Sequence, residues 1–323
     1  MSDSISFAGR VVVVTGAGRG MGRAHAHEFA RRGASVVVND VDAGYAEQVG
    51  ADIVAGGGRA VVVGTSVATP EGGQLVIEAA IEAFGTVDVV VSNAGILGVE
   101  NFADLTVAQV IQMHDTNLMG SWWVAQPAWR VMKAKDYGRI VIVGSSTGIF
   151  GQFGTAHYGS AKGGLWGLTK AIACEAEPTG IRANLLLPGA LTTIGDAAYA
   201  EIAGRGLNPG EFMFGDRVKC FETLMSDPDR AAPEVNSHMV AYLASEECEL
   251  NGEAFTSGFG SYSRVFTGIG RGWLAPDPLA LSAEAIRDHL DEIRDISSFT
   301  TPKYTGDELD GVSQRVEALR SES

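Results

Sequence analysis

The chain has 323 residues, of which 46% are apolar, so it can bury the core of one large globular domain or of two smaller ones. Its 39 acidic residues outnumber the 24 lysines and arginines, and the net charge of -15 argues against nucleic acid and anionic membranes as partners. No run of about 18 apolar residues predicts a membrane span, and residues 1–10 lack the features of an export signal.

Cysteine and histidine are sparse and badly spaced for holding a metal ion. Cys174, Cys220 and Cys248 are far apart in the sequence and form no CxxC pair. His25 and His27 are two residues apart on a predicted helix, so their side chains point in different directions. The sequence therefore predicts no metal site, and it predicts a cytoplasmic location in which thiols stay reduced.

Short runs of β-branched residues alternate with longer segments of helical periodicity over the first two thirds of the chain. The predicted strands cover residues 11–14, 35–38, 60–63, 87–91, 140–143 and 181–187. The predicted helices include residues 21–32, 71–84, 107–134 and 156–177. Continuous apolar strands are buried on both faces, and this alternation is typical of parallel sheets. We predict an α/β fold with a doubly wound parallel sheet of about seven strands.

The pattern loosens after residue 187. Residues 188–229 are rich in Gly, Ala and Pro, and we interpret residues 193–229 as a substrate lid. A helix is expected at 233–245 and an edge strand at 253–256. The chain is thus predicted to form one domain over residues 1–260. The C-terminal extension 261–323, with a helix at 282–296, is expected to pack on that domain or on a neighbouring subunit.

A glycine-rich turn follows the first strand and leads directly into a helix. Residues 15–22 read TGAGRGMG. Glycine is needed there because a side chain would keep a phosphate away from the free N–H groups at the helix N-terminus. An ordinary tight turn also uses glycines, but strand, turn and helix follow one another in the order that a dinucleotide site requires. Gly16, Gly20 and Gly22 are the expected contact positions.

Asp40 ends the second predicted strand and bears on the choice of nucleotide. Its carboxylate can accept hydrogen bonds from the adenosine ribose hydroxyls and would repel a 2′-phosphate. Arg19 argues the other way, because a guanidinium in the loop can reach a 2′-phosphate. We predict NAD as the cofactor, with NADP as the alternative.

Tyr158 and Lys162 lie four residues apart at the start of a predicted helix, so both side chains project from the same face. Tyrosine has a pKa near 10, too high for a base at neutral pH, and a neighbouring ammonium group can lower it. The YxxxK spacing alone is common on solvated helices. Its meaning here depends on the motifs around it.

Taken together, the motifs resemble those of the short-chain dehydrogenase/reductase family, in the family's order and over residues 8–260. They are TGxxxGxG at 15–22, SNAG at 92–95, Asn117, Ser145, YxxxK at 158–162 and PGxxxT at 188–193. The resemblance implies a Rossmann-type domain that interconverts a secondary alcohol and a ketone by direct hydride transfer to or from a nicotinamide.

The resemblance also implies a role for each member of a catalytic tetrad. Ser145 would orient the substrate oxygen, and Tyr158 would exchange its proton. Lys162 would lower the pKa of the tyrosine and bind the nicotinamide ribose, and Asn117 would support a water relay. His157, next to the tyrosine, is interpreted as a surface or packing residue rather than a catalytic one.

The family pattern further predicts which residues contact the cofactor. They are Gly16, Arg19, Gly20, Met21, Gly22, Asp40, Ser66, Val67, Asn93, Ala94, Gly95, Tyr158, Lys162, Pro188, Gly189 and Thr193. Two positions depart from the pattern: Ser92 replaces a first asparagine, and Ser66 replaces an aspartate that commonly precedes the valine at the adenine.

The C-terminal part, with the residue run DHLDEIRD, resembles bacterial relatives of the dehydrogenase part of peroxisomal multifunctional enzyme type 2. Those relatives act on 3-hydroxyacyl-CoA thioesters or hydroxysteroids. Apolar residues in the expected lid favour a small apolar alcohol or ketone, and a terpenoid or other cyclic alcohol fits equally well. The resemblance implies a homotetramer or a homodimer. Two alternatives remain: an NADP-dependent ketone reductase, and a dinucleotide-binding sensor or scaffold without turnover.

Overall fold

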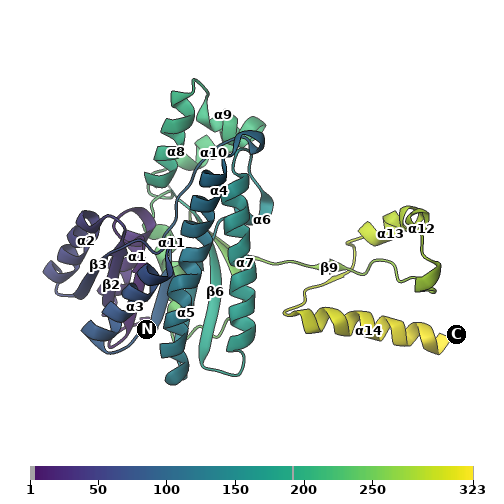
Figure 1. The fold of residues 1–323 in the computed structure, drawn as a ribbon, viewed down its shortest axis with the longest axis horizontal. Helices are drawn as coiled ribbons and strands as arrows, with labels where there is room; N and C mark the ends of the chain where they lie inside the picture. The colour runs from purple at the N-terminus through teal and green to yellow at the C-terminus, as the bar shows by residue number, and fades with distance from the viewer. Residues whose placement is uncertain (1–3, 191–192, 323) are drawn as a thin grey trace. The chain divides into compact units, whose positions relative to one another are not determined.

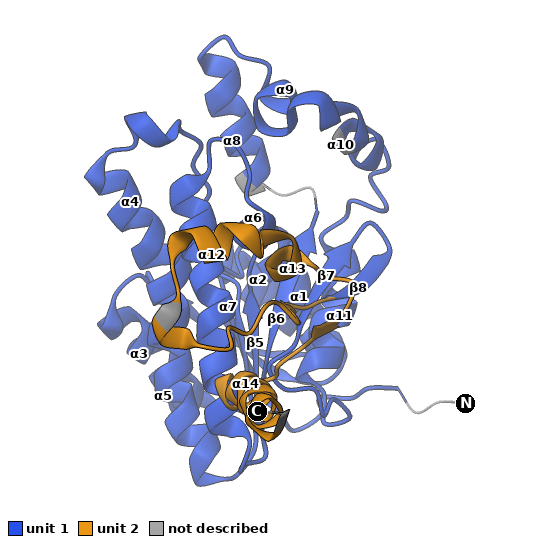
Figure 2. Cartoon of the chain, turned by 90° about the vertical axis from the view of Figure 1, so that its right-hand side faces the viewer, with its two compact units in different colours: residues 1–264 blue, residues 265–323 orange. Residues whose placement is uncertain are grey.

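The computed structural model describes residues 4–190 and 193–322 of the chain. It divides into two compact units, residues 1–264 and residues 265–323 (Figure 2). The first unit contains the sheet and every residue of the predicted site. The second unit is described separately below.

An eight-stranded sheet forms the centre of the first unit, with the strand order β3-β2-β1-β4-β5-β6-β7-β8. The strands are β1 Val11–Thr15, β2 Ser35–Asp40, β3 Arg59–Gly64, β4 Val89–Ser92, β5 Gly138–Val143, β6 Ile181–Gly189, β7 Ala254–Gly258 and β8 Ser261–Val265. Neighbours from β3 to β7 pair in parallel. The predicted doubly wound parallel sheet is therefore confirmed.

Two details of the sheet differ from the prediction. The strand expected at the edge, β7, lies between β6 and β8. The eighth strand, β8, has the sequence SYSRV and is largely exposed, so no apolar run marked it as a strand. Its pairing with β7 also extends the sheet past residue 260.

Helices cover both faces of this sheet: α1, α2 and α11 lie on one face, and α3, α5 and α7 on the other (Figure 1). The helical segments are α1 Gly20–Arg31, α2 Ala43–Ala55, α3 Pro70–Phe84, α4 Val107–His114, α5 Gly120–Ala134, α6 Thr147–Phe150, α7 Ala156–Ala176, α8 Thr193–Gly204, α9 Pro209–Phe214, α10 Val218–Met225 and α11 Glu234–Ala244, with short turns at η1 Phe102–Asp104, η2 Asp115–Met119 and η3 Gly215–Arg217.

The core sits between the sheet and these helices. All of β1, β2, β4 and β5 is buried, which explains why their sequences are continuous apolar runs rather than alternating ones. Phe7 packs edge-to-face on Phe29 of α1, with ring centroids 4.8 Å apart. Burying each such side chain contributes about 1.5–3 kcal/mol to the stability of the folded state. Many such contacts along the strands keep the sheet rigid, and a rigid sheet holds its strand ends in fixed positions.

Two stretches depart from the predicted helices. The single helix expected at 107–134 is α4 and α5 joined by the π-helical turn η2, which contains Asn117. The loose segment after residue 187 is largely helical, with α8, α9 and α10 gathered beyond one end of the sheet (Figure 1). Small residues and weak periodicity concealed these helices in the sequence.

The second unit contains a two-stranded antiparallel sheet, β9 with β10, and several helices. Its elements are β9 Ile269–Gly270, η4 Pro278–Ala280, α12 Ala283–Asp288, α13 Leu290–Arg294, β10 Phe299–Thr300 and α14 Thr305–Glu322. The helix expected at 282–296 is broken at His289, whose ring stacks on Trp273 with centroids 3.8 Å apart.

Candidate active site

The carboxyl ends of the parallel strands bring the predicted site residues to one edge of the sheet. β1 ends at Thr15, β2 at Asp40, β4 at Ser92 and β6 at Gly189. Strand β1 lies between β2 and β4, where the strand order reverses. In open α/β sheets, ligands bind outside the carboxyl ends of the strands at such a reversal.

The glycine loop after β1 folds tightly at the start of α1 and forms a cradle of backbone groups. Gly16 has φ +61°, and a Cβ on it would lie 2.8 Å from the Ala94 Cα. A Cβ on Gly22 would overlap the carbonyl oxygen of Gly16. Within the described residues, no side chain caps the N-terminus of α1. Its free N–H groups and the lack of side chains in the loop fit a pyrophosphate.

Thr15 and Asn93 join the glycine loop to the end of β4. The Thr15 hydroxyl accepts hydrogen bonds from the backbone N–H groups of Asn93 and Ala94, both at 3.0 Å. The Asn93 amide donates to the carbonyl oxygens of Thr15 at 3.0 Å and Gly16 at 3.1 Å. These hydrogen bonds from Asn93 therefore hold the glycine loop in place.

Asp40 is fixed by the backbone around it. Its two carboxylate oxygens accept hydrogen bonds from the N–H groups of Gly18 at 2.9 Å and Asp42 at 3.0 Å. The carboxylate is buried beside the loop. Each oxygen keeps a lone pair for a further donor, such as a ribose hydroxyl.

Lys162 and Tyr158 project from α7 toward the ends of β4 and β5. The ammonium group of Lys162 is buried, donates to the carbonyl oxygen of Val143 at 2.9 Å, and lies 5.9 Å from the centre of the Tyr158 ring. Burial lowers the pKa of Lys162 to about 8. Burial raises the pKa of Tyr158, and a hydrogen bond with the Ser145 side chain opposes that rise.

The loop that carries Ser145 approaches α7 more closely than side chains would permit. A Cβ on Gly148 would lie 2.5 Å from the backbone nitrogen of Gly163, and a Cβ on Gly163 would lie 2.9 Å from the Gly148 carbonyl oxygen. The two glycines let loop and helix touch through their backbones. This contact places Ser145 next to Tyr158.

Asn117 connects α4 to the segment after β4. Its buried amide donates to the carbonyl oxygens of Ile96 at 3.0 Å and Met113 at 3.1 Å, and its side-chain oxygen accepts from the Ile96 N–H at 3.2 Å. A Cβ on Gly95 would lie 2.6 Å from that oxygen and 3.4 Å from the Lys162 ammonium. The structure thus brings Asn117, Gly95 and Lys162 together.

Other predicted cofactor contacts are less closely gathered. Ser66 is exposed after the edge strand β3, and its hydroxyl accepts from the Ala68 N–H at 3.2 Å. Val67 is buried, and a Cβ on Gly120 would lie 3.0 Å from one of its methyl groups.

The remaining predicted contacts lie in or near the glycine loop and at the end of β6. Arg19 immediately precedes α1, and Met21 lies in its first turn. Pro188 and Gly189 end β6, and the Gly189 carbonyl oxygen accepts from the Asn236 amide at 3.1 Å. Thr193 begins α8, but its side chain lies outside the described residues.

The family model for short chain dehydrogenases matches residues 10–201, which is more than half of the chain. This chain belongs to the short-chain dehydrogenase family.

The relatives of this chain include proteins of similar length and much longer ones. The chain is 34% identical to mouse peroxisomal multifunctional enzyme type 2, covering all of this chain but 42% of that protein. It is 37% identical to a putative short-chain dehydrogenase/reductase of Mycobacterium tuberculosis over 79% of this chain and 84% of that one. The chain spans less than half of the mouse relative.

Solved structures show the same relationship. Full-length peroxisomal multifunctional enzyme type 2 from Drosophila melanogaster aligns with a TM-score of 0.78 and 28% identity, covering 98% of this chain and 51% of that one. A short chain dehydrogenase from Mycobacterium avium aligns with a TM-score of 0.72 and 30% identity, covering 90% of this chain and 97% of that one.

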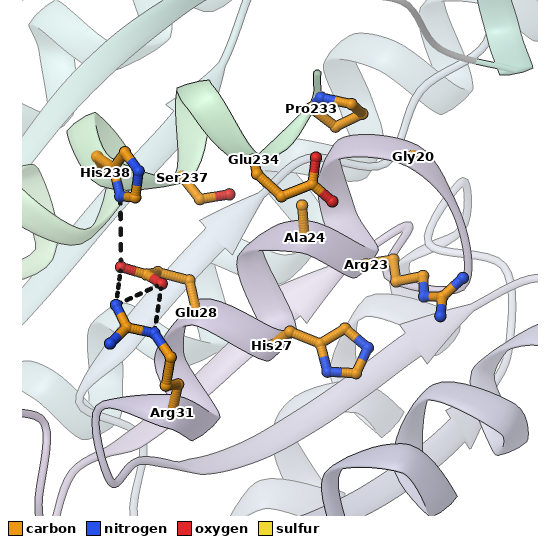
Figure 3. A pocket seen from close by; sticks show the side chains of 10 residues that line it. All are labelled: Gly20, Arg23, Ala24, His27, Glu28, Arg31, Pro233, Glu234, Ser237 and His238. Atoms are coloured by element: carbon orange, nitrogen blue, oxygen red, sulfur yellow. Dashed lines mark hydrogen bonds and ion pairs between the residues drawn. The ribbon is translucent and has the colours of Figure 1, made fainter. Parts of the chain in front are cut away.

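A cavity of about 610 Å³ lies between α1 and α11 (Figure 3). Glu28 lies in it between Arg31, at 2.9 Å, and His238, at 3.5 Å. Of the predicted site residues, Gly20 alone lines this cavity. It is therefore distinct from the cluster around Tyr158.

Sequence reasoning missed several residues that shape this short-chain dehydrogenase site. Gly163 contacts the Gly148 backbone and the Asn236 side chain donates to the Gly189 carbonyl oxygen, and no spacing rule marks either residue. Tyr45, whose ring lies under Arg19, is far from the loop in sequence. Gly18 was visible inside the glycine motif, but its contact with Asp40 depends on how β2 lies beside β1.

No group of three or more His, Cys, Asp or Glu side chains among the described residues is arranged to hold a metal ion. No described helix is long and apolar enough to cross a membrane.

Proposed function

We propose that this chain is an NAD-dependent oxidoreductase that interconverts a secondary alcohol and a ketone. One observation carries the proposal: Ser145, Tyr158 and Lys162 converge beside the edge of the sheet at which the glycine loop opens. A base, a polar partner and a cation thus lie next to a cradle for a dinucleotide.

Each side chain has a part in moving the proton. Tyr158 takes the proton of the alcohol oxygen in oxidation and returns it in reduction. The positive charge of Lys162 favours the phenolate, because opposite charges nearby lower the pKa of an acid. Ser145 hydrogen-bonds with the phenol and is placed to orient the same substrate oxygen. When bound, a nicotinamide dinucleotide supplies the hydride acceptor or donor.

Asp40 supports NAD over NADP. A 2′-phosphate placed at the end of β2 would meet the Asp40 carboxylate, with Asp42 two residues further on. An NADP-dependent ketone reductase is the alternative, and Arg19 is the feature that favours it. The direction of the reaction depends on cofactor ratios and on the substrate.

Apolar side chains beyond the sheet edge support an apolar substrate. A buried cluster joins the segment after β4 to α8 and α9, with core residues Val99, Ala198, Ile202 and Met213 and partly buried neighbours Leu97, Tyr199, Phe212 and Phe214. Its partly buried apolar neighbours would suit contact with a cyclic or terpenoid alcohol, a hydroxysteroid or the acyl chain of a 3-hydroxyacyl-CoA. We include residues 193–229 in this proposal as a substrate lid.

The assembly and location belong to the same proposal. We expect a homotetramer or homodimer, as the family resemblance implies, with residues 261–323 packing on the domain or on a neighbouring subunit. Three free cysteines are consistent with a reducing cytoplasm. Several relatives carry "peroxisomal" in their names, and localisation of a tagged full-length chain would decide between the compartments.

The test is a substrate screen with NAD and NADP in parallel. The panel contains 3-hydroxyacyl-CoA thioesters, hydroxysteroids and monocyclic terpenols, and the readout is nucleotide reduction. We expect NADH formation with at least one apolar alcohol. Strong preference for NADP would contradict the role given to Asp40, and tight nucleotide binding without turnover on any substrate would favour a sensor or scaffold.

A further inference from the structure

Arg19 and Tyr45 form a pair at the mouth of the glycine loop. The guanidinium carbon of Arg19 lies 4.4 Å from the centre of the Tyr45 ring. Both side chains are exposed, Tyr45 to 45%. In the described part of the chain, this ring is the one partner found for the guanidinium group. The pair lies at the nucleotide site of the proposed function, on which the inference below rests. It takes no part in the proposed proton or hydride transfer.

The position of Tyr45 is set by its surroundings. Its backbone N–H donates to the Asp42 side chain at 3.2 Å, which caps α2. A Cβ on Gly18 would lie 2.8 Å from the Tyr45 Cβ and 2.9 Å from an Asp40 carboxylate oxygen. The ring therefore rises from a tightly packed junction between the loop and the start of α2.

The charged groups at this junction determine how the Arg19–Tyr45 contact affects a nucleotide with a 2′-phosphate. A 2′-phosphate carries nearly two negative charges at neutral pH, and it would approach Asp40 and Asp42. Arg19 is the cation of the loop that can compensate these charges. While its guanidinium rests on the Tyr45 ring, reaching a 2′-phosphate means giving up a cation–π contact.

We propose that Tyr45 is a specificity-determining residue, which disfavours the 2′-phosphate by holding the Arg19 guanidinium over its ring. Asp40 selects for a free ribose hydroxyl, and Tyr45 withholds the compensating cation from a phosphorylated one. The two effects act in the same direction, against a phosphate at the 2′ position of the adenosine ribose.

Equilibrium binding of NADPH and NADH to the full-length protein tests this without any alcohol substrate. Nucleotide fluorescence gives both dissociation constants for wild type, Tyr45→Leu and Tyr45→Phe. In Tyr45→Leu we expect NADPH to bind about two- to fivefold more tightly, as loss of an exposed cation–π contact implies, and NADH to bind as before. Tyr45→Phe keeps an aromatic ring and should match wild type.

A double variant tests whether the effect acts through Arg19, and a second single variant serves as a replacement for Tyr45→Leu. Adding Arg19→Met to Tyr45→Leu should remove the gain for NADPH, and Tyr45→Gln replaces Tyr45→Leu if that variant does not fold. An unchanged ratio of NADPH to NADH affinity in Tyr45→Leu, or a Tyr45→Phe variant that behaves like it, would overturn the inference. Wild-type protein that binds neither nucleotide would refute the proposed function itself, and this inference with it.

Discussion

Lys162 is subject to two opposing requirements, because burial disfavours its positive charge and the proposed chemistry needs that charge. Its ammonium group is buried against the Val143 carbonyl oxygen, and burial brings its pKa from 10.5 to about 8. At neutral pH the group is still mostly charged, as the proposed chemistry requires. A buried charge with one hydrogen bond costs folding free energy, so the site is less stable than an apolar one would be.

This cost predicts a pH-dependent stability. The unfolded chain binds the Lys162 proton more tightly than the folded one, so the folded state gains stability as the pH rises from about 8 toward 10.5. The full difference corresponds to about 3 kcal/mol. Between pH 7 and pH 10, wild type should gain about 2 kcal/mol relative to Lys162→Met in urea unfolding. Parallel pH profiles of the two proteins would show that the charge carries no such cost.

Much of the residue-level site was predictable. Asp40, Tyr158 and Lys162 follow from spacing, because their motifs place them at strand ends or on one helix face. The contacts that hold them do not. Gly148 lies three residues after Ser145, but its contact with Gly163 can be recognised only once the fold is known.

At the scale of elements, Arg205 joins the proposed lid to the segment after β4. Arg205 follows α8 and donates to the Glu100 carboxylate at 3.1 Å and to the Val99 carbonyl oxygen at 3.0 Å. It also pairs with Glu201 of α8 at 2.6 Å. These contacts connect α8 to the segment after β4, in addition to the buried apolar cluster that joins the same two parts.

Replacing Arg205 should therefore loosen α8. The Arg205→Gln variant loses a charged hydrogen bond and two partly exposed ion pairs, together worth about 1 kcal/mol. Hydrogen exchange measured by mass spectrometry should become about fivefold faster in peptides from α8, with peptides from β1 unchanged. Arg217→Gln, an exposed position in η3, is the matched control. Equal protection of α8 from hydrogen exchange in wild type and Arg205→Gln would contradict this role of Arg205.

Elements were predictable where their sequence is periodic. The buried strands and the helices α1, α3 and α7 stand out as apolar runs and helical repeats. The turn at Asn117 does not, since its widened backbone accompanies hydrogen bonds to Ile96, a residue on another segment. The helices α8 to α10 escaped notice because small residues and glycines obscure their apolar face.

For the whole molecule, the sheet is what turns dispersed motifs into one site. Residues from Thr15 to Gly189 meet because parallel strands end at the same edge. The alternation of strands and helices predicted this parallel sheet. The order of the motifs along the chain carried the family resemblance. It did not predict the structure of residues 265–323, where single turns and short helices leave little periodic signal.

The most direct test of the account is Tyr158→Phe, measured with any alcohol that the screen identifies. The change removes one hydroxyl and keeps the ring, so nucleotide affinity should stay within about threefold of wild type. Turnover should fall by about 10²–10⁴-fold, the usual contribution of a general acid or base. Tyr262→Phe, whose hydroxyl donates to the Val235 carbonyl oxygen, is the control and should keep full turnover. Full turnover in Tyr158→Phe would contradict the proposed mechanism.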